Sequence, residues 1–482
     1  MSLYQPECLS DQPLWGGKPT GLDDREKVLR RVKSTMEGQL SPLKFDLETG
    51  DWPSASQSNW IRLKKGKAVA VITGQQPCLW GGPSLILHKL ITTLNIVRWL
   101  ESEGVSAVPV FWNASEDHDL QEMLQVGVMD RDRNIETHSR SWSAQSVSAE
   151  ALPSFNLSEE RFSFSSIVRE SFDLGETRFA AQFTSSLLHL FGDQGLVVVE
   201  PRDLERGSES FWEQVEVKQE SLLKSYDESE QRILQGGNSL QAPRRHPLPI
   251  FGLANKTGVR LPYAEISSRE KFSYSDLRSQ GYRASPGALL RPLMAQWALP
   301  IAVTVLGPAE AKYHEQLFGG FEVLGLSKPL IWPRLGGTWV PEDVESILTG
   351  LGQNVRAVLE ESLLQVPLNH HQDMAIRALS AHMRAMRQEG VGRKGGAQAL
   401  DRLDRDMFSA LGRFERGLQK ESLLEKGLTP KEGDRLLRFL LPRGVYQERH
   451  LGWSNILRDQ KHLEQIQKVF NDPFDKSHRI YS

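Results

Sequence analysis

Three carboxylates and a histidine lie within four consecutive positions of the stretch "FWNASEDHDL" at 111–120. They are Glu116, Asp117, His118 and Asp119. A histidine among carboxylates suits proton transfer, because one carboxylate can fix its tautomer while the imidazole acts as a base. A carboxylate here could instead bind a substrate amine or a Mg²⁺-nucleotide. The alternative without chemistry is a helix start, with Ser115 as the N-cap and the acidic residues stabilised in the first turn.

A second candidate stretch, "VITGQQPCLWGGP" at 71–83, leaves an apolar run through two glutamines and three glycines. The glycines permit close approach of a ligand and positive φ angles. We expect Gly82 and Pro83 to begin a helix whose amino end offers N–H groups to an anion, with a structurally demanding turn as the alternative. Gln75 and Gln76 add amide groups that could orient the anion. The candidate substrate-binding residues here are Thr73, Gly74, Gln75, Gln76, Pro77, Gly81, Gly82 and Pro83, together with Lys89 in the helix.

Two further turns carry candidate ligand-binding residues. In "LLRPL", Arg291 precedes Pro292 at an apparent helix start, where a guanidinium suits a carboxylate or a phosphate. In "GPAEAKYHEQL", a Gly-Pro turn leads from an apolar run into a helix with Glu310 and Tyr313 on one face. A surface arginine and a purely structural turn are the alternatives. The candidate substrate-binding residues of these turns are Arg291, Gly307, Pro308, Glu310 and Tyr313.

Five apolar, β-branched runs must position these residues. Near-continuous apolarity without alternation predicts strands that are covered on both faces, as in a parallel sheet with helices on each side. Ligands bind such sheets where a strand ends and the chain turns into a helix, which is where the candidate residues lie. We therefore predict an α/β fold with a doubly wound parallel sheet. The predicted strands lie at 67–73, 106–112, 195–200, 301–306 and 329–332.

The segments between and after these runs indicate further units. Two long polar stretches, before the third and the fourth run, exceed one crossover helix, so we expect connecting inserts or lids, with plain surface loops as the alternative. After residue 340, apolar residues at heptad spacing predict an antiparallel coiled-coil hairpin, with helices folded back on the sheet as the alternative. The helix after Pro83 is expected to leave His88, Thr92 and Asn95 on a side away from its apolar face. The expected division is core at 1–135, 191–204 and 286–340, connecting inserts at 136–190 and 205–285, a helical coiled-coil region at 341–445 and a C-terminal segment at 446–482.

The composition narrows the classes of partner. The 482 residues are 39% hydrophobic and 25% charged with a formal net charge of −3, a balance that gathers neither nucleic acid nor an anionic membrane. The first twenty residues lack the basic start and apolar stretch of a secretory signal, and the apolar runs are too short to cross a bilayer. Two cysteines, Cys8 and Cys78, allow neither a disulfide framework nor a zinc site of three or four thiolates. We expect a cytoplasmic protein without a nucleic-acid, membrane or tightly bound metal partner.

Six blocks follow one another from about residue 67 to residue 453: "TGQQPCLWGGP", "VPVFWNASEDHDL", "LFGDQGLVVVEP", "LLRPLMAQ", "LGPAEAKYHEQL" and "LPRGVYQERHLGW". In this order they resemble the blocks of the bacillithiol biosynthesis family BshC. The resemblance implies a Rossmann-like core with inserted connecting subdomains and a C-terminal α-helical coiled coil that forms a homodimer. It also implies a ligase that joins cysteine to glucosaminyl malate in the last step of bacillithiol biosynthesis, driven by ATP or another nucleotide, with or without Mg²⁺.

Amide formation requires an activated carboxyl group and a neutral amine. Our hypothesis is that the loop 73–83 and Arg291 bind anionic groups of the malate or of the activated acyl donor. A transferase that uses a nucleotide-activated sugar and a non-catalytic dimeric binding protein are the alternatives. The residues assigned to the amine are Asp117 or His118 as the proton acceptor and Glu116 or Asp119 as the orienting group.

The chain departs from the family pattern in four respects. Cys78 stands where glycine is usual, Trp80 where phenylalanine is common and Leu120 where an aromatic residue often occurs, and the chain is shorter than typical members. A thiol near a helix amino end could be an activated nucleophile. Because the family pattern has glycine at this position, we expect Cys78 instead to fill space beneath Trp80 as a small apolar group.

The heptad pattern leads to a prediction about assembly. Met383, Met407 and Phe414 are expected to pack between the hairpin helices, some of them across a two-fold axis. We predict that light scattering at micromolar concentration gives twice the 54.4 kDa mass of one chain. A monomer under these conditions would contradict the proposed interface.

Overall fold

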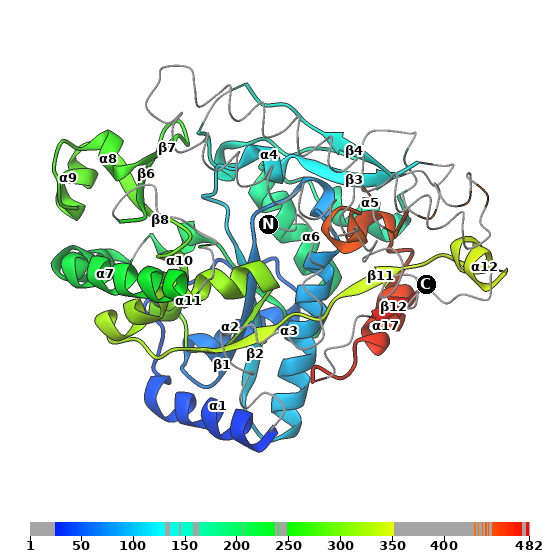
Figure 1. Ribbon diagram of the computed structural model, residues 1–482, viewed down its shortest axis with the longest axis horizontal. Coiled ribbons are helices and arrows are strands. Elements are labelled where there is room, and N and C mark those ends of the chain that lie inside the picture. Colours follow the sequence, from blue (N-terminus) through cyan, green and yellow to red (C-terminus); the bar gives the residue numbers. More distant parts are fainter. Residues whose placement is uncertain are drawn as a thin grey trace.

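The fold is described from a computed structural model of the chain (Figure 1). The described residues are 25–350 and 446–481, apart from short gaps, and a few positions between 429 and 442. The predicted coiled-coil hairpin and its heptad residues lie outside them, so that part of the predicted fold stays a prediction. The gaps are 131–134, 144–145, 158–161, 163, 206, 237–239, 241–247 and 475–478.

A five-stranded parallel sheet forms the centre of the fold. Its strand order is β10-β9-β1-β2-β5, and each neighbouring pair runs parallel. Between β1 and β2 the register pairs Val69 with Ala107 and Gln75 with Asn113. Each of the five predicted runs overlaps one of these strands, which confirms the predicted parallel sheet. The strands are β1 Val69–Gln75, β2 Ala107–Asn113, β5 Val197–Val199, β9 Ile301–Leu306 and β10 Leu330–Pro333.

Helices cover both faces of this sheet. Val69 and Val71 of β1 pack with α1 and α3 on one face, whereas Ala70 and Ile72 belong to the opposite core with α2, α7, α10 and α11. Burial on both faces explains why the strands are continuously apolar. In Figure 1, α7 and α11 lie side by side. The covering helices are α1 Arg25–Gln39, α2 Ser54–Lys64, α3 Leu85–Ser102, α6 Phe179–Phe191, α7 Glu209–Gln235, α10 Arg291–Ala298 and α11 Pro308–Leu324.

Smaller elements surround the central sheet. An antiparallel hairpin consists of β3 Gln125–Met129 and β4 Ile135–Ser139. A second antiparallel sheet has the order β7-β6-β8, and β11 pairs with β12 in parallel. The proposed division into core and inserts stays a prediction. The other elements are β6 Ile250–Ala254, β7 Arg260–Pro262, β8 Tyr282–Pro286, β11 Gly337–Trp339, β12 Arg479–Tyr481, α4 Leu120–Met123, α5 Ser166–Phe172, α8 Tyr263–Ile266, α9 Tyr274–Ser279, α12 Glu342–Gly350 and α17 Gln460–Val469.

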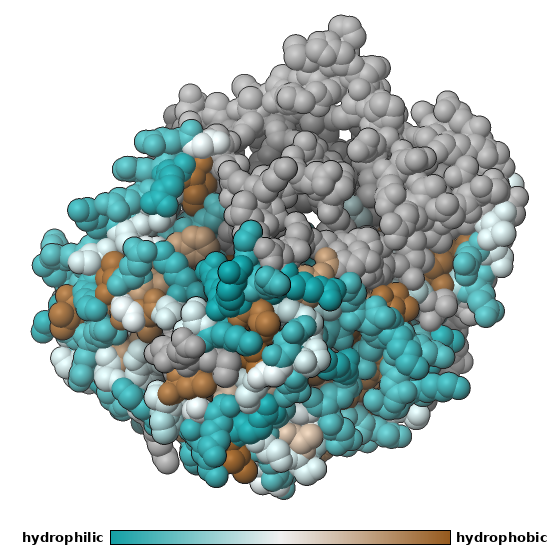
Figure 2. Space-filling model, turned by 90° about the horizontal axis from the view of Figure 1, so that it is seen from below, coloured by the Kyte–Doolittle hydropathy of each residue, from teal (hydrophilic) through white to brown (hydrophobic). Residues whose placement is uncertain are grey.

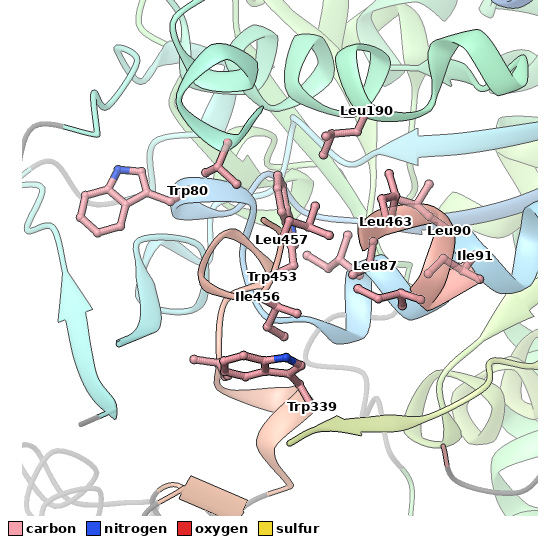
Figure 3. Packing of buried hydrophobic residues seen from close by; sticks show 14 of the residues in the cluster. Trp80, Leu87, Leu90, Ile91, Leu190, Trp339, Trp453, Ile456, Leu457 and Leu463 are labelled. Carbon is pink, nitrogen blue, oxygen red and sulfur yellow. The ribbon is translucent and has the colours of Figure 1, made fainter. Parts of the chain in front are cut away.

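The C-terminal segment 446–474 docks against elements from the first third of the chain. Trp453 Nε1 donates a hydrogen bond to the Gly81 carbonyl at 2.6 Å. The Ser84 N–H donates to the Leu451 carbonyl at 2.8 Å. This segment therefore belongs to the folded core. Figure 3 shows its side chains Trp453, Ile456, Leu457 and Leu463 packed near Leu87, Leu90 and Ile91 of α3.

The predicted helix start at Gly82 and Pro83 is wrong. α3 begins at Leu85, with Ser84 at its N-cap position. Gly82 has a φ of 72° and ends the preceding 3-10 turn, while Pro83 pairs with Gly452 in an isolated bridge. The docked C-terminal segment thus occupies part of the helix end that we expected to face a ligand.

The expected polar side of α3 is also buried. His88, Thr92 and Asn95 are all buried. The His88 ring stacks on Phe470, and Thr92 Oγ1 accepts a hydrogen bond from the Leu335 N–H at 3.0 Å. Helical periodicity alone placed these residues on an exposed side. That prediction failed because the segments that cover them, which include Leu335 and Phe470, lie far from α3 in the sequence.

The predicted N-cap at Ser115 is wrong as well. The acidic stretch forms a turn after β2, and the short helix α4 starts only at Leu120. Asp119 is its N-cap, since its side chain accepts a hydrogen bond from the Glu122 N–H at 3.2 Å. Helix capping therefore accounts for Asp119 but not for the other acidic residues of the stretch.

One face of the described surface is shown in Figure 2. On the face shown in Figure 2, described residues are mostly hydrophilic and hydrophobic ones are scattered among them. Among the helices of the described ranges, none is both long enough and apolar enough to cross a bilayer.

Gly81→Ala tests the docking of the C-terminal segment. A Cβ on Gly81 would lie 2.1 Å from the Trp453 ring, and its φ of +83° disfavours a side chain. Gly175 has a similar φ of +75° with open space around it, so Gly175→Ala reports the backbone cost alone. We expect Gly81→Ala to lower the free energy of unfolding by about 1–3 kcal/mol more than Gly175→Ala, measured by denaturant titration. Equal losses would mean that Trp453 moves aside without cost.

Candidate functional site

A cleft of about 610 Å³ lies at the carboxyl ends of β1 and β9. The chain passes outward from β1 through β2 to β5 and then returns to the other side of β1 as β9. Ligands of open α/β sheets bind where the strand order reverses in this way. The ends of both strands, the starts of α10 and α11, and the C-terminal segment together form the wall.

Most of the predicted substrate-binding residues line this cleft, and so does Asp117. The predicted residues that do not line it are Pro77, Gly81 and Gly82, together with Glu116, His118 and Asp119. Gly81 contacts Trp453 instead, as described above. The predicted substrate-binding residues that lie in the wall are Thr73, Gly74, Gln75, Gln76, Pro83, Lys89, Arg291, Gly307, Pro308, Glu310 and Tyr313.

Lys89 is a buried cation that joins three parts of the wall. Its Nζ donates to the Gly74 carbonyl at 2.9 Å, to Gln75 Oε1 at 2.9 Å and to Glu310 Oε1 at 2.7 Å. These contacts use all three N–H donors of an ammonium group. Lys89 therefore supports the wall, and its donors are already occupied by the protein.

Glu310 is the second half of this support. Its other oxygen, Oε2, accepts a hydrogen bond from the Gly307 N–H at 2.7 Å and so caps α11. Burial acts to raise the pKa of Glu310, but the charge and hydrogen bond of Lys89 outweigh it and hold that pKa below its ordinary value. The carboxylate is therefore ionised at neutral pH and fixed in place.

Asp117 and Arg291 form an ion pair in the wall of the cleft. Arg291 Nη2 donates to Asp117 Oδ2 at 3.0 Å. Burial acts to raise the pKa of Asp117, but the positive charges of Arg291 and Arg260 outweigh it and hold that pKa well below its ordinary range. Asp117 is thus an ionised carboxylate that can hold an ammonium group and that accepts a proton poorly.

His118 lies beside Asp117 but turns towards another arginine. Arg260 Nη1 lies 3.0 Å from His118 Nδ1, so Nδ1 is the acceptor and Nε2 carries the proton of the neutral ring. Burial and the Arg260 charge lower the pKa of His118, which keeps the imidazole neutral. Its basic lone pair faces Arg260, so a role as proton acceptor would require this contact to break.

Glu116 belongs to a separate buried cluster behind the cleft. Its Oε2 accepts from Ser285 Oγ at 2.6 Å, and its Oε1 lies 3.5 Å from Arg283. Burial raises the pKa of Glu116. The four adjacent candidates thus face in different directions: Asp117 towards the cleft, His118 and Glu116 towards other arginines, and Asp119 along α4.

The wall also contains residues that the sequence analysis did not single out. Arg334 directly follows the strand β10, whereas Arg449 and His450 belong to the sixth block of the family resemblance, from which no residue was chosen. Glu122 lies at the rim, where its Oε2 accepts from Gln76 Nε2 at 3.3 Å. Partial burial and the nearby carboxylates of Asp119 and Asp117 raise the pKa of Glu122.

Cys78 is a buried thiol in the wall. It shares an apolar cluster with Trp80, and its Sγ donates to the Gln76 carbonyl at 3.3 Å. Burial raises the pKa of Cys78 far above its ordinary value, and the Glu122 carboxylate adds to the shift. The sulfur is therefore a protonated packing group rather than an activated nucleophile.

The donors in the cleft suit an anion better than a bare metal ion. Arg334 and Arg449 lie in the same wall as Gly307 and Ala309, at the amino end of α11, where N–H groups and the helix dipole favour negative charge. Within the described ranges, no group of three or more His, Cys, Asp or Glu residues is arranged to hold a metal ion. Carboxylate or phosphate groups fit this part of the wall.

Comparisons with known proteins match the part of the chain that forms the central sheet. A family model described as "Bacillithiol biosynthesis BshC, N-terminal Rossmann-like domain" matches residues 26–335, a range that contains all five strands of the central sheet. A relative from Koribacter versatilis is 26% identical over 442 residues, which cover 83% of this chain and 81% of the relative. Relatives from Solibacter usitatus and Geobacillus kaustophilus are each 25% identical, covering 80% and 82% of this chain and 79% and 80% of their own.

All three relatives bear the name "Putative cysteine ligase BshC". The family model spans well over half of the 482 residues and includes β1, β9 and the turn that carries Asp117. The chain therefore belongs to the BshC family of bacillithiol biosynthesis.

Proposed function

We propose that this protein is a cysteine ligase that joins the carboxyl group of L-cysteine to the amine of glucosaminyl malate. One observation carries the proposal: a BshC-family chain places an ionised carboxylate, Asp117, and several cationic groups around one cleft at the strand-order reversal. An amine substrate that also bears carboxylates needs this combination. The proposed substrates, the product and the nucleotide are inferred from the family and the chemistry of the wall.

The amine side of the reaction falls to Asp117 and Glu122. The ammonium group must lose one proton to become a nucleophile, and the nitrogen loses a second proton as the amide forms. Asp117 would hold the ammonium group by charge, because its own pKa is too low for efficient proton acceptance. Glu122 would accept the proton, since it lies on the rim with a raised pKa.

On the acyl side of the reaction, the cationic groups of the cleft wall would bind the anionic parts of the substrates. Arg291, Arg334, Arg449 and the amino end of α11 would hold the malate carboxylates and the phosphates of a nucleotide. A bound nucleotide would supply the group that turns a cysteine carboxyl oxygen into a leaving group. Neutralising these negative charges would let a carboxylate substrate and a phosphate approach each other.

The setting of the reaction is part of the proposal. A thiol substrate and a thiol product require a reducing compartment, so we assign the protein to the cytoplasm. A homodimer formed through the coiled-coil region remains our proposal for the assembly. Neither nucleic acid nor a membrane has a part in it.

The proposal predicts one product. Purified protein given L-cysteine, glucosaminyl malate, ATP and Mg²⁺ should yield a compound with the summed mass of the two substrates less one water, detected by mass spectrometry. Omission of cysteine or of the nucleotide should abolish it. Turnover with a UDP-sugar in the absence of cysteine would select the transferase alternative, and tight binding of glucosaminyl malate without turnover would select the non-catalytic binding protein.

Asp117→Asn should lower kcat/KM for the amine substrate by about 10²-fold, because the amide lacks the charge that holds the ammonium group. Asp119→Asn is the matched control: Asp119 lies outside the cleft wall, and asparagine is an equally good N-cap. Steady-state kinetics on folded variants measures both. Equal losses in the two variants would mean that the whole acidic stretch acts together.

Cys78→Ala provides a second control. A protonated, buried thiol has no covalent role, so this variant should keep most of its activity. Complete loss of ligation in folded Cys78→Ala protein, with a trapped acyl adduct on Cys78 in the parent, would contradict the assignment.

A further inference from the structure

Arg334 is a cation of the cleft wall whose side chain is held in place by hydrogen bonds to other protein groups. It follows β10 and is 8% exposed. Its Nη1 donates to the Leu335 carbonyl at 3.2 Å, and its Nη2 donates to Glu448 Oε1 at 2.6 Å. These two bonds use two of the five N–H donors of a guanidinium. Its Nε lies 3.6 Å from the place that a Cβ on Gly307 would take, so the group sits beside the amino end of α11.

Glu448 is the buried carboxylate that holds Arg334. Besides the bond from Arg334, its Oε2 accepts from the Gly337 N–H at 2.9 Å and lies 3.0 Å from His88 Nδ1. Burial acts to raise the pKa of Glu448, but the charge of Arg334 and the hydrogen bond from His88 outweigh it and hold that pKa well below its ordinary value. An ionised carboxylate therefore joins the C-terminal segment, α3 and the residues after β10.

His88 extends the network to the C-terminal strand. Burial lowers the pKa of His88, so its ring is neutral, and the ionised Glu448 requires the proton to be on Nδ1. The other nitrogen, Nε2, must then accept from the Tyr481 hydroxyl, which lies 3.0 Å away. Tyr481 belongs to β12, which pairs with β11 three residues beyond Arg334. Four side chains thus form one hydrogen-bonded network: Tyr481 donates to His88, and His88 and Arg334 both donate to Glu448.

We propose that Glu448 is a positioning residue that fixes Arg334 as the receptor for an anionic group of a substrate, and that His88 and Tyr481 orient Glu448. The inference rests on the proposed function, because it assigns a role within the same cleft. The ligand group is a carboxylate or a phosphate, since a guanidinium recognises both by paired N–H bonds.

Stability alone is a poor account of this network. The attraction within a buried ion pair is largely offset by the cost of removing both charges from water. The benefit that remains is orientation: a guanidinium held by two hydrogen bonds presents its other donors to the cleft in one geometry. Preorganised donors bind an anion without the loss of side-chain freedom that a mobile arginine would incur.

Binding measurements can test the positioning role apart from turnover. We would titrate the full chain and its Glu448→Gln and Tyr481→Phe variants with L-malate and, separately, with inorganic phosphate by calorimetry. Loss of the charged partner should weaken at least one probe about tenfold in Glu448→Gln, and loss of the hydroxyl should weaken the same probe several-fold in Tyr481→Phe. Weakening of malate alone assigns Arg334 to a carboxylate, and weakening of phosphate alone assigns it to a phosphoryl group.

Tyr226→Phe is the matched control for a buried tyrosine. Its hydroxyl donates to the Leu289 carbonyl at 3.2 Å, and Tyr226 is not in the cleft wall. It should lose thermal stability to a similar degree as Tyr481→Phe while both probes bind as in the parent. In ligation assays, Tyr481→Phe should raise KM for one anionic substrate with little change in kcat.

The outcomes separate this inference from the proposed function. Unchanged affinity for both probes in the folded variants, or no binding of either probe to the parent, overturns the positioning role. Should Glu448→Gln fail to fold, Tyr481→Phe decides alone. Absence of the ligation product from the parent protein overturns the proposed function, whereas probe affinities that still depend on Glu448 would leave the anion receptor in place.

Discussion

The buried ammonium group of Lys89 is the contact on which the cleft depends. An unpaired charge at 1% exposure would be costly, so its three acceptors must meet at one point. Those acceptors come from the end of β1 and the first turn of α11, which brings together the two strand ends that flank the reversal. Glu310 binds Lys89 with one oxygen and caps α11 with the other, so the ion pair and the helix start cannot be separated.

The central sheet could be predicted from the sequence because its signal is local. Each strand is a short apolar run, and burial on both faces needs no knowledge of what covers it. The helix starts could not be predicted so well. Ser84 and Asp119 take the N-cap positions because the preceding residues are held by turns and by Gly452 across a bridge, a contact between positions far apart in the chain.

The candidate site was partly predictable for the same reason. Residues at or just after the ends of strands, such as Gln75, Asp117 and Gly307, lie in the cleft as the parallel topology requires. The direction of neighbouring side chains was not predictable, since Glu116 and His118 turn to arginines from β7 and β8. Arg449 and Glu448 escaped notice because nothing in a local pattern reveals that the C-terminal segment closes a cleft formed some 370 residues earlier.

The burial of Cys78 also affects how this thiol reacts with disulfides. Thiol–disulfide exchange requires a thiolate that a disulfide can reach, and the buried, protonated Cys78 sulfur offers neither condition. An enzyme that releases a small thiol would face a rising pool of the corresponding disulfide whenever the cell meets an oxidant. At Cys78 the fold therefore disfavours a mixed disulfide with any small thiol, so this part of the cleft wall keeps its packing while such a pool is oxidised.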